Sequence, residues 1–172
     1  MSTGSLPKVL VDADVVSHFL VGERMSLLNT VFPGRLAMVS QVEQELRVVR
    51  RFNNTIDNFI RFCQVEQLEL PDDDALTLEY FTLQRTFGKG ESACMALARH
   101  CGNYIASSNL RDIKTYCEKY HITYYTTMDV LCLAVEQGHM TEPECDMFIH
   151  RVKSHKGKLP CNTYQEYTSL KA

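Results

Sequence analysis

Four acidic residues lie where a strand is expected to end or a helix to begin. Asp12 ends an apolar run in VLVDADVV, and Glu45 follows the run RLAMV in VSQVEQEL. Glu91 opens a segment of helical pattern in GKGESACMALAR, and Asp112 follows the apolar stretch YIASS in SSNLRDIK. In an open parallel sheet the ligand site lies beyond the carboxyl ends of the strands. We therefore expect these four carboxylates to share one site.

A shared site of this kind needs a cation. Four carboxylates roughly 6 Å apart, at an effective dielectric constant near 20, repel by about 3 kcal/mol per pair and by a total on the order of 15 kcal/mol before relaxation. A domain stable by about 5–15 kcal/mol cannot tolerate this repulsion without binding a cation or protons. Hard oxygen ligands favour Mg²⁺ or Mn²⁺. The cluster therefore predicts metal-assisted hydrolysis of a phosphodiester.

Neighbouring acids extend the candidate ligand set, although each acid also has an ordinary structural explanation. An aspartate after a strand is often a helix cap, and an acid in the first turn of a helix is favoured by the helix dipole. Asp14, Glu43 and Asp129 are additional candidate ligands. The acidic run at residues 72–74 is predicted to cap a helix rather than to bind metal.

Short apolar segments rich in β-branched residues alternate with longer segments of helical periodicity. This alternation predicts an α/β fold, a three-layer α/β/α sandwich with a mainly parallel sheet of four to five strands. Strands are expected at residues 8–12, 35–39, 65–70, 104–107 and 122–126. Helices are expected at residues 15–31 (one or two helices), 41–51, 55–63, 73–87, 91–101, 110–120, 128–137 and 142–154. Ser40 is expected to cap a helix, and Thr141 with Glu144 to form a capping box.

The composition is that of one ordinary domain. The chain has 172 residues, of which 45% are hydrophobic and 23% charged. We expect a single domain over residues 1–172, with a core at 8–141 and a C-terminal helical extension at 142–172. No apolar run approaches the ~18 residues that cross a bilayer, and the first residues lack the pattern of a secretory signal. We therefore expect a cytoplasmic protein that does not contact membranes.

Seven cysteines are present, and no two of them form a C-x-x-C pair. Zinc ribbons and redox sites need that spacing, so reduced structural thiols are expected. A soft-metal site using Cys94, His100 and Cys101 would lack a second pair of ligands.

The formal net charge of −3 gives no overall attraction to nucleic acid, so any RNA binding would need a local basic patch. Two groups of basic residues are candidates for contacts with phosphates. They are Arg47, Arg50 and Arg51 in the first group, and Arg151, Lys153, Lys156 and Lys158 in the second.

The order of the motifs resembles the PIN domain, the nuclease fold of many prokaryotic toxins and of some RNA-processing enzymes. The motifs are VLVDADVV, VSQVEQEL, GKGESACMALAR, YIASSNLRDIKTYC and ITYYTTMDVLCLAVEQGHMT, and they extend from about residue 8 to residue 141. The resemblance implies a metal-dependent ribonuclease that uses Mg²⁺ or Mn²⁺ and RNA. Its catalytic and metal-binding acids would be Asp12, Glu45, Glu91 and an acid of the SSNLRD segment. A small antitoxin protein and a second copy of the chain are candidate partners.

The fourth acid departs from the PIN pattern. PIN domains usually carry an aspartate directly after this strand, where the present chain has Ser108 and Asn109. We expect Asp112 to complete the site, because it lies about one helical turn past Asn109 and can point back toward the strand. Asp129 is the alternative.

Two other functions remain open. One is a PIN-like module that binds RNA or a protein with little or no catalysis, since Asn109 brings no charge. The other is a phosphatase of the haloacid dehalogenase type, because DADVV matches the D-x-D-x-V form of that family. Asp12 would then attack phosphorus and Asp14 act as the acid. No GD pair follows a later strand, and the acidic run at residues 72–74 is predicted to cap a helix, which favours the nuclease.

Overall fold

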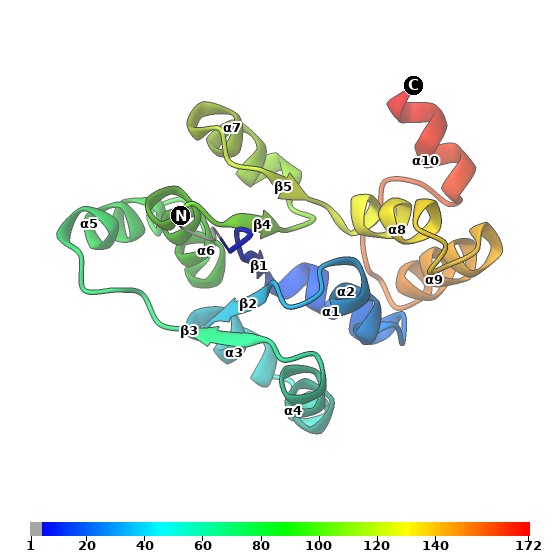
Figure 1. Ribbon diagram of the computed structural model, residues 1–172, viewed down its shortest axis with the longest axis horizontal. Helices are drawn as coiled ribbons and strands as arrows, with labels where there is room; N and C mark the ends of the chain where they lie inside the picture. The colour runs from blue at the N-terminus through cyan, green and yellow to red at the C-terminus, as the bar shows by residue number, and fades with distance from the viewer. Residues whose placement is uncertain (1–4) are drawn as a thin grey trace.

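A computed structural model describes residues 5–172 and contains one five-stranded sheet in which every neighbouring pair of strands is parallel. The strand order is β3-β2-β1-β4-β5 (Figure 1). The strands are β1 Val9–Val11, β2 Leu36–Val39, β3 Glu66–Leu68, β4 Tyr104–Ala106 and β5 Tyr124–Tyr125. All five strands lie within their predicted segments, and the α/β prediction is confirmed.

Helices flank the sheet to form a three-layer α/β/α sandwich. The helices are α1 Ala13–Val21, α2 Met25–Val31, α3 Ser40–Arg47, α4 Asn53–Phe62, α5 Asp74–Leu83, α6 Lys89–Cys101, α7 Leu110–Tyr120, α8 Thr127–Glu136, α9 Glu142–Ser154 and α10 Tyr164–Lys171, with a 3₁₀ turn η1 at Arg50–Phe52. Figure 1 shows α8, α9 and α10 gathered at one end of the molecule. Within residues 5–172, every helix is too short or too polar to cross a membrane.

The strand order creates a crevice between β1 and β4. From β1 the chain passes outward to β2 and β3, and it then returns to the other side of β1 to form β4 and β5. Ligands of open α/β sheets bind outside the carboxyl ends of the strands at such a reversal. Val11 pairs with Ala106, and the N–H of Asp12 donates to the carbonyl of Ala106. Asp12 therefore lies at this crevice, beside the residues that follow β4.

Small side chains allow α6 to pack closely against the sheet. Residues 92–98 of this helix are all buried, and α6 contacts β1, β2 and β4. Strand β1 is completely buried, as expected for the central strand of a covered parallel sheet. The first turn of α6 is thereby held close to the end of β1.

Two of the predicted helix caps are confirmed. Asp73 is the N-cap of α5, and its carboxylate accepts a hydrogen bond from the N–H of Leu76. Thr141 and Glu144 form the predicted capping box of α9.

The prediction that Ser40 caps a helix is wrong. Ser40 is the first residue of α3, and its hydroxyl donates to Glu69 instead. The helix is also shorter than predicted, because α3 ends at Arg47 and the chain continues into η1. Strand β5 is shorter too, since Thr126 already serves as the N-cap of α8.

Candidate active site

An open cleft of about 230 Å³ is present at the carboxyl ends of β1 and β4. Three of the four acids predicted from the sequence line it, namely Asp12, Glu45 and Glu91. The remaining lining residues are Ala13, Asp14, Gly88 and Asn109. The structure thus brings together acids from α3, α6 and the β1–α1 junction.

Asp12 is the most buried of these acids, with 6% of its surface exposed. It is the N-cap of α1, and its Oδ1 accepts a hydrogen bond of 2.8 Å from the N–H of Ala13. Burial, followed by the charge of Asp14, raises the pKa of Asp12 to about 7. Hydrogen bonds from Ala13 and Ser107 favour the charged form but do not offset the burial.

Asp14 ties α1 to the end of β4. Its Oδ2 accepts from the N–H of Ser108 at 2.9 Å, and its Oδ1 accepts from the N–H of Val15 at 2.6 Å. Burial raises the pKa of Asp14 despite these hydrogen bonds. Asp14, an additional candidate in the sequence, therefore belongs to the cleft.

Glu45 reaches the cleft from α3 and contacts the first turn of α6. Its Oε1 accepts a hydrogen bond of 2.9 Å from the N–H of Gly90. The first N–H groups of a helix have no partner within the helix, so this carboxylate satisfies one of them. The contact also couples the position of Glu45 to that of Glu91.

Gly90 is required at this contact because a side chain there would collide with α3. A Cβ atom at Gly90 would lie 2.9 Å from Cγ2 of Val42 and 3.1 Å from Oε1 of Glu45. We expect Gly90→Ala to lower the free energy of unfolding by roughly 1–2 kcal/mol, measured by urea denaturation.

Gly88→Ala is the matched control for that substitution. A Cβ at Gly88 would have only Oε1 of Glu45 nearby, at 3.9 Å, which is an ordinary contact. Gly88 is the N-cap of α6, where alanine costs some cap stability but creates no collision. A Gly90→Ala protein at least as stable as Gly88→Ala would contradict the close packing of α3 on α6.

Asn109 connects Glu91 to Asp112. Its Nδ2 donates to Oε1 of Glu91 at 3.2 Å and to Oδ2 of Asp112 at 2.7 Å. Burial, followed by the charges of Asp12 and Asp112, raises the pKa of Glu91 to about 7. Asp112 does not line the cleft, and it is linked to the cluster by this amide and by its charge.

The negative charge of the cluster is not balanced by a basic side chain. Within residues 5–172, no Lys, Arg or His forms an ion pair with Asp12, Asp14, Glu45, Glu91 or Asp112. Over the same residues, no three His, Cys, Asp or Glu side chains are placed so that they could hold a metal ion. The cleft suits a hard divalent cation by donor type and by charge, but its side chains do not form a ready coordination shell.

Comparisons with known proteins leave the family open. No family model matches the chain, and a search of the curated proteins finds no match. Inferences about function therefore depend on the geometry of the cleft.

A chain of hydrogen bonds next to the cleft links His18, Thr127 and Ser108. The sequence analysis assigned no role to His18. Nδ1 of His18 is 2.8 Å from Oγ1 of Thr127, which is 2.6 Å from Oγ of Ser108. Burial lowers the pKa of His18 to about 4, so the ring is neutral at pH 7. The sequence feature that could have indicated a role for His18 is its position as a polar residue inside the apolar segment DVVSHFLV. This network fixes Ser108, whose N–H holds Asp14.

Asp129 and Glu43 lie outside the cleft. Asp129 forms the capping box of α8 with Thr126 and an ion pair with Lys171. Burial acts to raise the pKa of Asp129, but the hydrogen bonds from Lys171 and Thr126 outweigh it, so the pKa is lowered. Glu43 is paired with Arg47. The alternative that Asp129 replaces Asp112 is therefore not supported.

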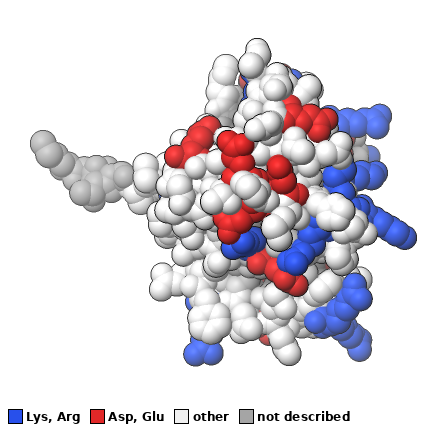
Figure 2. All heavy atoms as spheres, turned by 90° about the vertical axis from the view of Figure 1, so that its right-hand side faces the viewer, with Lys and Arg blue, Asp and Glu red and all other residues white. Residues whose placement is uncertain are grey.

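The two predicted basic groups do not form continuous positive surfaces. Arg47 pairs with Glu43 and Asp57, and Arg151 pairs with Glu23. Figure 2 shows that carboxylates occupy the middle of the face that lies at the right of Figure 1, with Lys and Arg bordering them. The residues of the two basic groups that form no ion pair within residues 5–172 are Arg50, Arg51, Lys153, Lys156 and Lys158.

The cysteines do not form a metal site among the described residues. Cys94 is buried and Cys101 is exposed on the same helix, while His100 is 2.5 Å from Glu79. All seven thiols are free.

Proposed function

We propose that this protein is a metal-dependent ribonuclease of the PIN type, which hydrolyses phosphodiester bonds of RNA in the acidic cleft. One observation carries the proposal. Four carboxylates, those of Asp12, Asp14, Glu45 and Glu91, line one cleft at the reversal of the strand order, and no basic residue within 5–172 pairs with them. Unbalanced carboxylates of this kind favour a divalent cation.

The residues have distinct tasks in this proposal. Asp12, Glu45 and Glu91 would hold Mg²⁺ or Mn²⁺ after their side chains move closer together, and Asp112 would add its charge beside Asn109. When bound, such a cation neutralises charge on the phosphate and lowers the pKa of a bound water. Asp12 and Glu91 have pKa values of about 7 in the protein alone, so both would release protons as a cation binds near neutral pH.

Two basic residues support RNA as the substrate. Lys89 directly follows Gly88, which lines the cleft, and Arg111 lies two residues after Asn109, which also lines it. Neither residue forms an ion pair anywhere in 5–172. Both are exposed, and both are therefore available to contact phosphates of an RNA.

A PIN-like module that binds RNA without cleaving it is the second candidate. The observation that favours it is Asn109, whose amide already donates to both Glu91 and Asp112 and so replaces part of what a second cation would do. The phosphatase alternative has less support. Asp73 of the acidic run after β3 caps α5 instead of lining the cleft, so the cleft lacks the later acidic pair that the phosphatase would need.

Cleavage of a labelled single-stranded RNA tests the proposal. We expect the protein to cleave it in Mn²⁺ and to stop in EDTA. Glu91→Gln should slow cleavage at least roughly 100-fold, equivalent to ~2.7 kcal/mol of lost transition-state stabilisation. Glu43→Gln, which changes an acid on α3 outside the cleft, is the matched control and should cleave as the unmodified protein does.

The other outcomes separate the alternatives. RNA binding without cleavage in Mn²⁺ or Mg²⁺ would favour the binding module. Hydrolysis of p-nitrophenyl phosphate without cleavage of RNA would favour the phosphatase.

A further inference from the structure

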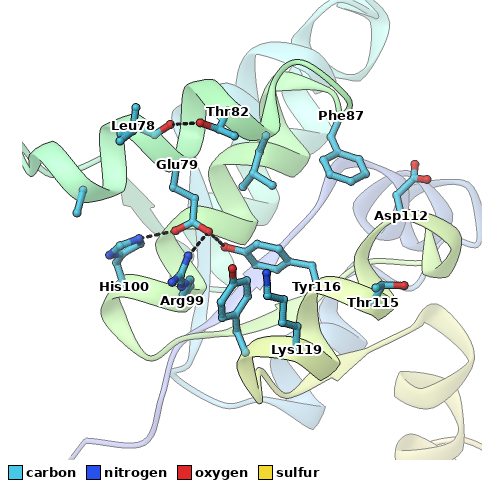
Figure 3. A pocket seen from close by; sticks show the side chains of 13 residues that line it. Leu78, Glu79, Thr82, Phe87, Arg99, His100, Asp112, Thr115, Tyr116 and Lys119 are labelled. Carbon is cyan, nitrogen blue, oxygen red and sulfur yellow. Dashed lines mark hydrogen bonds and ion pairs between the residues drawn. The ribbon is translucent and has the colours of Figure 1, made fainter.

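A second cavity, of about 620 Å³, lies among α5, α6 and α7. Leu78 and Leu83 line it from α5, and Tyr116 and Tyr120 line it from α7. Phe87, from the segment that joins α5 to α6, closes one end beside Asp112 and Thr115 (Figure 3). Its walls are mostly apolar, and its size is that of a typical small-ligand pocket.

The polar side chains that line this cavity form hydrogen bonds with one another. Glu79 accepts hydrogen bonds from Arg99 at 2.6 Å, from His100 at 2.5 Å and from the hydroxyl of Tyr116 at 2.6 Å (Figure 3). Burial acts to raise the pKa of Glu79, but these three donors outweigh it, so the pKa is lowered. The carboxylate is thus compensated, and it fixes the ring of Tyr116 at the cavity wall.

The cavity adjoins the acidic cleft at two points. Phe87 lines the cavity, and the next residue, Gly88, lines the cleft. Asp112 lines the cavity and is hydrogen-bonded to Asn109, which lines the cleft. A chain molecule with one group in the cleft can therefore place the adjacent group in the cavity.

Phe87 is half-buried against the hydrophobic core, and among the aromatic rings that line the cavity it is the one that pairs with no other ring within residues 5–172. Tyr116 and Tyr120 pack against each other, and the guanidinium of Arg99 covers Tyr120 at 3.8 Å. Phe87 takes part in no ring pair or cation–π contact within residues 5–172. Lys119, at the cavity wall, forms no ion pair among the same residues, and its ammonium lies 4.9 Å from the centre of the Tyr120 ring.

We propose that this cavity binds an unpaired nucleobase of the RNA strand whose phosphate lies in the acidic cleft, with the base stacked on Phe87. The inference rests on the proposed function for the position of the phosphate. Unpaired bases stack on aromatic side chains, whereas bases within a duplex are already stacked and paired. Lys119 would contact the backbone of the same strand. The cavity therefore selects single-stranded RNA.

Binding of a labelled octaadenylate RNA in Mn²⁺, measured by fluorescence anisotropy, tests this inference. The protein used carries Glu91→Gln, which slows cleavage, in every variant and in the reference, and a gel shows that the RNA stays intact. Base stacking on one ring is worth enough that Phe87→Ala and Phe87→Leu should each weaken binding roughly 10-fold. Phe87→Tyr keeps the ring and should bind as the unmodified protein does. Phe81→Ala is the matched control, because this ring is 60% exposed on α5 and does not line the cavity. Binding of an RNA duplex should be unchanged in all four variants.

The outcomes distinguish this inference from the proposed function. If the protein cleaves RNA but the Phe87 variants bind the octamer normally, the base site is wrong and the nuclease stands. If the octamer binds through Phe87 but is never cleaved, the base site stands and the nuclease is wrong. Equal losses for Phe87→Ala and Phe81→Ala, or no binding of single-stranded RNA, would overturn the base site. Melting temperatures show whether Phe87→Ala is folded, and Phe87→Leu replaces it if it is not.

Discussion

Asp12→Asn should make the protein more stable in the absence of metal and should abolish its activity. The pKa of Asp12 is raised from 3.8 to about 7 in the folded protein, chiefly by burial. At 1.36 kcal/mol per pKa unit, its ionisation above pH 7 costs on the order of 4 kcal/mol of folding free energy. Asparagine is as good an N-cap as aspartate, so α1 keeps its cap.

The size of the gain should depend on pH. A carboxyl group with a raised pKa binds more protons in the folded state than in the unfolded state between pH 4 and pH 7, so stability falls as the pH rises through that range. Asp12→Asn removes this loss. Without metal, its melting temperature should exceed that of the unmodified protein by roughly 5–15 °C at pH 8. The difference should shrink as the pH is lowered and disappear below about pH 4.

Metal should narrow this difference in stability. Mn²⁺ at about 100 times its dissociation constant would stabilise the unmodified protein by ~2.7 kcal/mol, whereas Asp12→Asn should respond little. Asp72→Asn, at an exposed acid outside the cleft, removes the same charge and should behave as the unmodified protein does in both conditions. Cleavage of RNA by Asp12→Asn should fall at least roughly 100-fold. Thermal unfolding with and without Mn²⁺ at several pH values measures these effects on stability. If Asp12→Asn melts at a lower temperature than the unmodified protein at pH 8 without metal, the predicted gain in stability is refuted.

Local patterns predicted the fold well because they operate within single segments. The run KVLVD and the small-residue helix after GKGE each specify a buried element by composition alone, and both elements occur at the predicted place. The position of an acid directly after a strand also fixes where it lies in a parallel sheet. Asp12 shares the cleft as predicted because it directly follows β1, whereas Glu45 and Glu91 reach the same cleft from the helices α3 and α6.

Side-chain partnerships across the chain could not be predicted in the same way. Asp129 lies in the first turn of the helix that follows β5, but its carboxylate is occupied by Lys171, 42 residues away. His18 contacts Thr127 across 109 residues. The cavity beside Phe87 is formed by three helices whose packing no spacing in the sequence reveals. Such features depend on tertiary contacts rather than on local pattern.

Asn109→Asp should strengthen metal binding in the cleft, because it adds a carboxylate beside Glu91 and Asp112. The Asn109 amide now donates to Glu91 and Asp112, so an aspartate would replace two favourable contacts with two like-charge contacts. Because Asn109 is exposed, solvent screens much of that repulsion, and we expect a loss of about 1–2 kcal/mol of stability without metal. With the added charge, the affinity for Mn²⁺ should rise roughly tenfold, equivalent to ~1.4 kcal/mol.

Isothermal titration with Mn²⁺ and the rate of RNA cleavage measure these effects. Asn109→Ala is the matched control, because it removes the amide without adding charge. It should lose stability without gaining affinity for Mn²⁺, since Glu91 and Asp112 then face each other with no donor between them. If Asn109→Asp gains affinity and cleaves faster than the unmodified protein, a missing charge limits the natural site. If Asn109→Asp binds Mn²⁺ no better than Asn109→Ala, residue 109 is not at a position where a side chain can ligate the cation. An added carboxylate at such a position must attract the cation.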